Sequence, residues 1–325
     1  MSALEDVLSP LSRYYAQRDV IELRMSRPGS VVIDRRGIGK QVIHDDRLTL
    51  SLIGNICRAL ANNEGIAFNA NSKPKLSCII PGGRHRFECA IGPSVQTGLS
   101  LAIRCKHGFT PTWDDLGVDE DLHGYFYQTV AGSQNIIISG ATNTGKTTLL
   151  NLLLDMVPDS RRVVAMEDTP EISLDRFYDG IGLIAGRDDG AHAAMLNWRQ
   201  LYDHVMRITP DHIIFGEIST QNAYPALGAL NSGVTGFMCT IHAYSPWQAL
   251  NRKFDHNIAW SGQVMPRVPE FLADLIDVVI QIARDEDGLR RISHIYEPRG
   301  NRYLVGSPPE ARQGAGTSAL LEAAE

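Results

Sequence analysis

The chain has 325 residues, which is long for one compact domain and sufficient for two. It is 43% hydrophobic and 21% charged, as soluble globular proteins with sizeable cores are, and no apolar run approaches the roughly 18–20 residues that span a bilayer. The formal net charge is −6 and the sequence has no basic arm or stripe, which argues against stable nucleic-acid binding.

The N-terminal segment and the cysteines bear on the cellular compartment. The first ten residues, MSALEDVLSP, contain acids and no basic region, so we do not expect a secretory signal. The cysteines are scattered and odd in number, which is typical of reduced, mostly buried thiols in a cytosolic protein. We expect no zinc site, because ligand spacing of the usual kind is missing. The five cysteines are Cys57, Cys78, Cys89, Cys105 and Cys239.

The first predicted element is an amphipathic helix at the N-terminus. Leu4, Val7, Leu8 and Leu11 recur at helical spacing, and Pro10 is expected to bend or interrupt the helix. The apolar face favours packing in a core or between subunits over contact with a membrane surface.

The residues that follow mix short strands with a second helix, so we predict an α+β N-terminal domain over residues 1–107. The helix is predicted over residues 48–60, with Asp45 and Asp46 near its start as possible caps. Strands are predicted at residues 20–23, 30–34, 76–80, 86–91 and 99–104.

Residues 108–124 are polar, acidic and rich in turn formers, and we predict a linker there. Beyond it, apolar runs alternate with helix-length stretches, a pattern typical of a parallel sheet wrapped by helices. We therefore predict an α/β domain over residues 125–300, with a flexible tail over residues 301–325. Its strands are predicted at residues 135–139, 162–166, 212–215 and 237–240, followed by a hairpin of residues 277–283 and 289–296.

The strongest motif is a phosphate loop, GATNTGKT, at residues 140–147. It lies between a buried strand and a helix, which is the context that the motif requires. Its glycines let backbone N–H groups converge on phosphates, while Lys146 reaches the β- and γ-oxygens and the Thr147 hydroxyl binds Mg²⁺. The residues expected to bind ATP are Gly140, Ala141, Thr142, Asn143, Thr144, Gly145, Lys146, Thr147 and Thr148.

Three later strands end in polar residues suited to hydrolysis. One delivers Glu167 and Asp168, the next Glu217 and the last His242, each at the edge where open α/β sheets bind ligands. Taken singly, the first two acids are also consistent with a helix cap, Glu217 with a solvated strand end and His242 with a structural histidine. Their order along successive strands favours a catalytic site.

These motifs together resemble the secretion ATPase superfamily of type II and type IV secretion, conjugation and type IV pili. GATNTGKTT, MEDTPEI, RITPDHIIFGEI and SGVTGFMCTIHA are similar to its phosphate loop, Asp box, Walker B segment and His box. RPGSVVID, PGGRHRFECAIGP and LSLAIR are similar to the N-terminal domain of the VirB-type traffic ATPases of type IV secretion. The resemblance covers roughly residues 3–300.

The resemblance implies a RecA-like P-loop NTPase domain and a ring-shaped homohexamer, cytoplasmic and peripheral at the inner membrane. Other type IV secretion ATPases and inner-membrane components are the implied partners. Glu167 would orient or deprotonate the attacking water, Glu217 would support Mg²⁺ through water, and His242 would sense the γ-phosphate. Arg86 and Arg104 match family arginines that approach the phosphates, although ordinary edge-strand arginines are an equal alternative.

Three positions depart from the family pattern. Gly233 is followed by Val234 where the His box has histidine, and Thr209 and Ser219 replace arginines near the Walker B segment, where Arg207 is kept. The lost positive charges predict an ATPase slower than the ~10 per second median of enzymes.

Three alternatives stay open at this point. A pilus or type II secretion motor often carries a four-cysteine zinc motif or a longer N-terminal region, and neither is present. A DNA translocase or recombinase fits poorly with the acidic charge. A nucleotide-gated adaptor with little turnover would explain the missing arginines and histidine.

Overall fold

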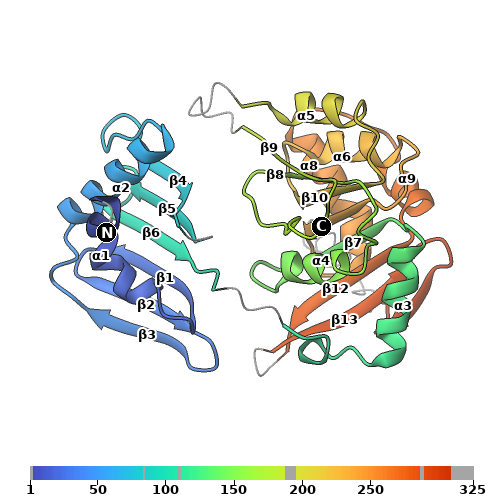
Figure 1. The fold of residues 1–325 in the computed structure, drawn as a ribbon, viewed down its shortest axis with the longest axis horizontal. Coiled ribbons are helices and arrows are strands. Elements are labelled where there is room, and N and C mark those ends of the chain that lie inside the picture. The colour runs from blue at the N-terminus through green and yellow to red at the C-terminus, as the bar shows by residue number, and fades with distance from the viewer. Residues whose placement is uncertain (1–2, 83–84, 108–110, 187–194, 286–288, 309–325) are drawn as a thin grey trace, which may run out of the picture. The chain divides into compact units, whose positions relative to one another are not determined.

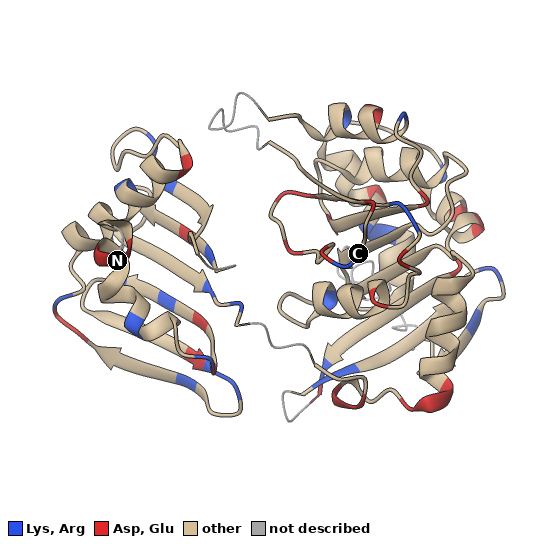
Figure 2. Ribbon diagram, viewed as in Figure 1, with Lys and Arg blue, Asp and Glu red and all other residues tan. Residues whose placement is uncertain are grey.

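The computed structural model describes residues 3–82, 85–107, 111–186, 195–285 and 289–308 (Figure 1). They divide in sequence near residue 110 into two compact units. Basic and acidic residues are interspersed over the ribbon of each unit (Figure 2). None of the described helices combines the length and the apolar character needed to cross a lipid bilayer.

The first unit is built on a six-stranded antiparallel sheet of order β3-β2-β1-β6-β5-β4. Burial alternates along β5 and β6, so one face of the sheet packs into the core. The predicted strands are confirmed, but β3 was missed because nearly all its residues are exposed and lack an apolar pattern. The strands are β1 Val20–Arg27, β2 Ser30–Arg35, β3 Gly39–His44, β4 Lys75–Ile79, β5 Arg86–Ile91 and β6 Leu99–Arg104.

Two helices, α1 Ala3–Tyr15 and α2 Leu50–Glu64, contribute their apolar faces to the core of this unit. The expected interruption of α1 at Pro10 is wrong, since the helix continues through it. Proline has no N–H to donate to the carbonyl of Asp6 four residues earlier. The Ser9 hydroxyl donates to that carbonyl instead, at 2.7 Å, which removes much of the cost of the proline.

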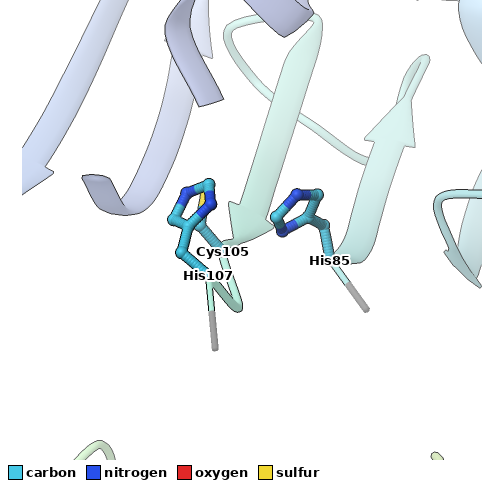
Figure 3. A group of neighbouring side chains, drawn as sticks. All are labelled: His85, Cys105 and His107. Atoms are coloured by element: carbon cyan, nitrogen blue, oxygen red, sulfur yellow. The ribbon is translucent and has the colours of Figure 1, made fainter. Parts of the chain in front are cut away.

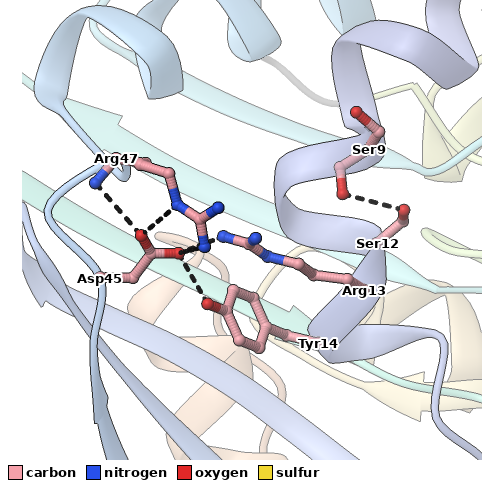
Figure 4. A network of polar contacts seen from close by, with 6 residues as sticks. All are labelled: Ser9, Ser12, Arg13, Tyr14, Asp45 and Arg47. Carbon is pink, nitrogen blue, oxygen red and sulfur yellow. Dashed lines mark hydrogen bonds and ion pairs between the residues drawn. The ribbon is translucent and has the colours of Figure 1, made fainter.

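The predicted caps of α2 are also wrong. Its N-cap is Thr49, whose Oγ1 accepts from Leu52 N at 3.2 Å. Asp45 is instead buried and accepts hydrogen bonds from Arg13, Tyr14 and Arg47 (Figure 4). It therefore links the end of α1 to the segment before α2, a contact between residues distant in sequence.

The second unit contains an eight-stranded sheet of order β14-β13-β12-β7-β11-β10-β8-β9. The strands from β12 to β9 in this order are parallel, and β13 and β14 extend the sheet as antiparallel strands. The predicted parallel sheet and C-terminal hairpin are confirmed. The strands are β7 Ile136–Gly140, β8 Val163–Glu167, β9 Gly180–Ile184, β10 His212–Ile218, β11 Met238–His242, β12 Val278–Arg284, β13 Arg290–Glu297 and β14 Arg302–Val305.

Helices cover both faces of this sheet, and two cores result. Ile137 belongs to one core, whereas Ile136 and Ile138 belong to the other, as alternation along a strand requires. The core of Ile136 and Ile138 includes α3 Glu120–Ala131 and α4 Lys146–Leu154. The core of Ile137 includes α5 Trp198–Val205, α6 Ala223–Leu230, α8 Phe254–Trp260 and α9 Val268–Leu275. Shorter helical segments are η1 Asp114–Leu116, α7 Pro246–Gln248 and η2 Ala249–Lys253.

Parts of the expected linker and of the expected tail are folded. Residues 111–124 fold into η1 and the start of α3, and Leu116 and Val118 are buried in the core of the second unit. In the expected tail, β14 pairs with β13, and the rings of Tyr296 and Tyr303 lie 4.6 Å apart. A few apolar side chains in polar surroundings are enough to dock both segments. Residues 108–110 and 309–325 lie outside the described residues.

Candidate nucleotide-binding site

Four adjacent parallel strands of the second unit carry the predicted site residues at their carboxyl ends. In the order β7-β11-β10-β8, these residues are Gly140, His242, Glu217 and Glu167. His242 is the direct register partner of Gly140. Because carboxyl ends of parallel strands share one edge, the fold gathers residues that are up to about a hundred positions apart in sequence.

The phosphate loop is shaped by close approaches that require its glycines. A Cβ on Gly140 would lie 2.5 Å from the carbonyl oxygen of Ile282 on β12. Gly145 has φ of 98° and Asn143 has φ of 61°, in the left-handed region. Thr144 is buried, and its Oγ1 donates to Ala141 O at 2.9 Å. The loop is therefore closed by its own backbone and side chains.

The loop leads directly into α4, whose first residue is Lys146 and whose N-cap is Gly145. No side chain caps this helix, so the N–H groups of its first turn are suited to receive an anion. Thr147 and Thr148 are half-buried in that turn, and Thr142 is exposed on the loop. This arrangement is suited to hold a polyphosphate.

Lys146, His242 and Glu217 form a chain of polar contacts. Lys146 is buried, and its Nζ lies 3.1 Å from Ala141 O and 2.9 Å from His242 Nδ1. His242 Nε2 lies 2.5 Å from Glu217 Oε1. A neutral imidazole with its proton on Nε2 satisfies both contacts, since it accepts from the ammonium group and donates to the carboxylate. His242 is thereby coupled to the residue that would bind the phosphates.

Glu167 is buried and oriented by backbone groups. Its Oε1 accepts from Glu171 N at 2.8 Å and from Ile172 N at 3.1 Å. The neighbouring backbone on β10 leaves little space, since a Cβ on Gly216 would lie 2.9 Å from Glu167 Cγ. Residues 168–174 are not helical, so Glu167 caps no helix.

The segment after Glu167 is tied to the phosphate-loop helix. Asn151 on α4 accepts from Ser173 N at 2.9 Å and donates to Glu171 O at 3.2 Å. Asp168, the second acid of this pair, is exposed. The geometry therefore favours Glu167 over Asp168 as the oriented carboxylate.

The donor set at this edge fits Mg²⁺ together with ATP. Thr147 supplies a hydroxyl and Glu217 an exposed carboxylate, and hard divalent cations prefer such oxygen ligands. Magnesium usually keeps several water molecules, which is compatible with an indirect role for Glu217.

Two arginines beside the loop were missed by the sequence analysis. Arg284 donates from Nε and Nη2 to Asn143 O, at 3.2 and 3.0 Å. Its register partner Arg290 approaches Gly145, where an added Cβ would lie 3.0 Å from Arg290 Cδ. No motif marks them, because their position depends on the pairing of β12 with β7.

The predicted arginines of the N-terminal segment lie in the first unit, whereas the phosphate loop lies in the second. Arg86 and Arg104 are half-buried and directly opposite each other on β5 and β6. Glu22 on β1 is the other register partner of Arg104. The two cations are thus presented side by side.

The three departures from the family pattern have local structural roles. Ser219 N donates to Asn222 Oδ1 at 2.7 Å just after β10, and Thr209 has φ of 48° in the turn before it. Val234 packs against the core that includes α6. None of the three side chains carries a positive charge.

Comparison with known proteins gives a family match over most of the chain. The model of the family described as "Type II/IV secretion system protein" matches residues 57–283. A conjugal transfer protein TrbB of Rhizobium radiobacter is 29% identical over 299 residues, covering 87% of this chain and 86% of that protein. A type IV secretion system protein VirB11 of Bartonella quintana is 24% identical over 341 residues, covering 92% and 94%.

Solved structures agree on the fold. The Legionella pneumophila ATPase DotB has a TM-score of 0.60 at 14% identity, covering 89% of this chain and 80% of that chain. The pilus retraction motor PilT with bound ADP has a TM-score of 0.59 at 15% identity, covering 95% and 84%. The predicted fold class, a RecA-like α/β domain preceded by a smaller α+β domain, is confirmed, as is the resemblance to secretion ATPases.

Proposed function

Because the chain belongs to the type II/IV secretion system protein family, we propose that it is an ATPase that couples ATP binding and hydrolysis to type IV secretion. The work it powers is pilus assembly and substrate translocation, in conjugation or in protein export. The observation that carries the proposal is the meeting of Lys146, His242, Glu217 and Glu167 at one sheet edge. Relatives named for conjugal transfer and type IV secretion support the cellular role.

The proposed reaction is attack of water on the γ-phosphorus of ATP, which breaks the bond to the ADP oxygen and yields ADP and phosphate. Backbone N–H groups of the loop and the Lys146 ammonium stabilise the charge on the phosphate oxygens. Glu167, held by two backbone N–H groups, orients the attacking water. Mg²⁺, when bound by Thr147 and through water by Glu217, would neutralise charge on the phosphates.

His242 is placed to report the state of the nucleotide. A γ-phosphate that draws Lys146 toward itself weakens the 2.9 Å contact with His242 Nδ1. A movement of the imidazole would then also move the Glu217 carboxylate, because His242 Nε2 lies 2.5 Å from Glu217 Oε1. We therefore assign His242 the role of linking the phosphate to the neighbouring strand end on β10.

The wider assembly is also part of the proposal. We place the chain in a homohexameric ring at the cytoplasmic face of the inner membrane, with other type IV secretion ATPases and inner-membrane components as partners. Arg86 and Arg104 close over the phosphates when the ring binds ATP, and their side-by-side register supports that role. Electron microscopy of the purified chain with and without ATP tests ring symmetry and nucleotide response together.

Two substitutions test the site. Lys146→Ala is expected to abolish hydrolysis and weaken ATP binding, while Glu167→Gln abolishes hydrolysis and leaves binding intact. Phosphate release and binding of a fluorescent ATP analogue measure the two effects, and losses of about 100-fold or more are expected. Glu120→Gln, an exposed residue at the start of α3, is the matched control. Normal hydrolysis by Glu167→Gln would show that its assignment is wrong.

A nucleotide-gated adaptor with little turnover is the second candidate, favoured by the arginines missing at Thr209 and Ser219 and the histidine missing at Val234. Secretion assays separate the two functions. An adaptor requires binding alone, so secretion would survive Glu167→Gln and fail with Lys146→Ala. A motor requires both residues, and its turnover is expected below the ~10 per second median of enzymes.

A further inference from the structure

Three side chains of the first unit that could serve as metal ligands meet at one edge of its sheet (Figure 3). His85 immediately precedes β5, while Cys105 and His107 follow β6. Each offers one ligand atom, and the three atoms lie within 4.8 Å of one another. In the part of the chain that the structure describes, this is the one group of three or more such residues.

We propose that His85, Cys105 and His107 form a binding site for a divalent transition metal of the zinc class. Zn²⁺ binds sulfur at about 2.3 Å and imidazole nitrogen at about 2.0–2.1 Å, so two ligands of a tetrahedral ion are about 3.3–3.6 Å apart. Small side-chain rotations bring the three atoms from their present separation to that distance. Two imidazoles and a thiolate suit zinc and its neighbours, whereas Mg²⁺ prefers oxygen ligands.

The backbone around the cluster is fixed by hydrogen bonds. Cys105 N donates to Ile21 O at 2.8 Å, and Ile80 N donates to the carbonyl oxygen of His85 at 2.9 Å. The antiparallel pairing of β5 and β6 ends at Arg86 opposite Arg104, so the residues just beyond them lie at the same edge. Two of the three ligands, His85 and Cys105, are therefore carried on backbone that is held by hydrogen bonds to neighbouring strands.

Without a cation, two of the three ligand side chains make few hydrogen bonds. His107 Nε2 is buried and has no hydrogen-bond partner among the described residues, which is costly for an imidazole nitrogen. Cys105 Sγ makes only a long contact of 3.7 Å with Ile103 O. The rings of His85 and His107 lie 4.9 Å apart, a separation compatible with two ligands of one ion.

Metal binding requires two local changes. His85 Nδ1 accepts from Lys106 N at 3.0 Å, and coordination through either ring nitrogen gives up that hydrogen bond. Burial, together with the negative charge of Glu22, raises the pKa of the Cys105 thiol to about 12, so a cation must displace its proton. Burial, with a smaller effect of His107, lowers the pKa of His85, which favours the neutral ring that binds metals.

The position of the site suggests what the ion does. It would tie residues 105–107, which follow β6, to the start of β5. Arg86 and Arg104 are the chain neighbours of His85 and Cys105, so a bound ion also fixes the backbone beside both arginines. Three protein ligands leave one tetrahedral position for water or a fourth group. The site does not depend on the proposed ATPase activity.

Cobalt titration of the full chain, prepared without a histidine affinity tag and measured without nucleotide, tests the site. One Co²⁺ per chain is expected, with a sulfur-to-cobalt charge-transfer band that Zn²⁺ abolishes by displacement. Cys105→Ser should remove the band, and His107→Gln should retain it with affinity lowered about 100-fold or more. Hydrogen exchange of the α1 amides in each variant verifies that the first unit, which carries the ligands, is folded.

Two matched variants act as controls. Cys78→Ser changes a half-buried cysteine on β4, and His44→Gln changes an exposed histidine at the end of β3; both should leave the band and the affinity unchanged. A wild-type chain that binds no Co²⁺, or a band that survives Cys105→Ser, overturns the proposal. So does a band lost in Cys78→Ser.

Discussion

In the second unit the candidate site lies at the ends of four parallel strands. In the first unit, the contacts of Asp45 join a helix to a loop, and the cluster of His85, Cys105 and His107 joins the ends of two antiparallel strands. Gly140, Glu167, Glu217 and His242 follow their strands in the order that the motifs predict. The contacts of Asp45 with Arg13 and Tyr14 span more than thirty positions and follow no motif.

The difference follows from strand geometry. Every parallel strand ends at the same sheet edge, so a polar residue after each apolar run is already placed near the others. Antiparallel strands end at alternate edges, and which ends meet depends on pairing and register. Sequence motifs therefore locate the site in the second unit, whereas the side-chain contacts of the first unit cannot be predicted from motifs.

The substitution with the largest expected effect is Gly216→Ala, which tests whether the close packing of β10 on Glu167 positions the site in the second unit. Gly216→Ala places a Cβ 2.9 Å from Glu167 Cγ, which displaces the carboxylate, and a displacement near 1 Å lowers the turnover number about 100-fold. ATP binding should persist, because Lys146 and the loop are untouched. Phosphate release and analogue binding measure the two quantities.

Gly124→Ala is the control for this change, since an added Cβ on α3 meets no atom within 4 Å. It should keep full activity. If Gly216→Ala were as active as Gly124→Ala, close packing of β10 on Glu167 would not position the site.

The next largest expected effect is on the stability of the first unit and comes from replacing the buried carboxylate of Asp45. Asp45→Asn weakens the hydrogen bonds from Arg47, Tyr14 and Arg13 (Figure 4), so the thermal unfolding midpoint of this unit should fall by several degrees. Asp46→Asn, a change to its exposed neighbour, should leave the midpoint unchanged. Hydrogen exchange of the α1 amides reports which unit responds.

The difference in stability between wild type and Asp45→Asn depends on pH, and its direction follows from the lowered pKa of Asp45. Hydrogen bonds from Arg47 and Tyr14 hold the pKa of Asp45 well below its usual range. The stabilisation is then complete above the unfolded pKa of about 3.9 and is lost as the pH falls toward the lower folded value. Wild type and Asp45→Asn should therefore converge below about pH 4, and a gap that widens there contradicts the network.

The smallest expected effect comes from removing one helix N-cap in each unit. Thr49→Ala removes the acceptor of Leu52 N in α2, and Asp119→Ala removes the acceptor of Leu122 N in α3. Each should cost about 1 kcal/mol of unfolding free energy. Hydrogen exchange should accelerate only in the unit that carries the change, so faster exchange in both units would show that they unfold together.

Much of the candidate site was predictable, because a phosphate loop and strand-end acids have few other interpretations. The side-chain links were not. The contacts of His242 with both Lys146 and Glu217 depend on the order β7-β11-β10, which local sequence does not specify. Arg284 lies beside the loop only because β12 pairs with β7.

The expectation of no zinc site relied on ligand spacing along the chain, and His85 is twenty positions from Cys105. The pairing of β5 with β6 removes that separation, since the start of one strand meets the end of the other.

By itself, the sequence determined the nucleotide loop, the parallel sheet and which residues stand at the carboxyl ends of its strands. Those features depend on local periodicity, on glycine conformations and on the common direction of parallel strands. Tertiary structure decided which residues join that edge from other strands, where Asp45 is bound, and which histidines surround Cys105. Those contacts depend on register and strand order, which are set by packing over the whole unit.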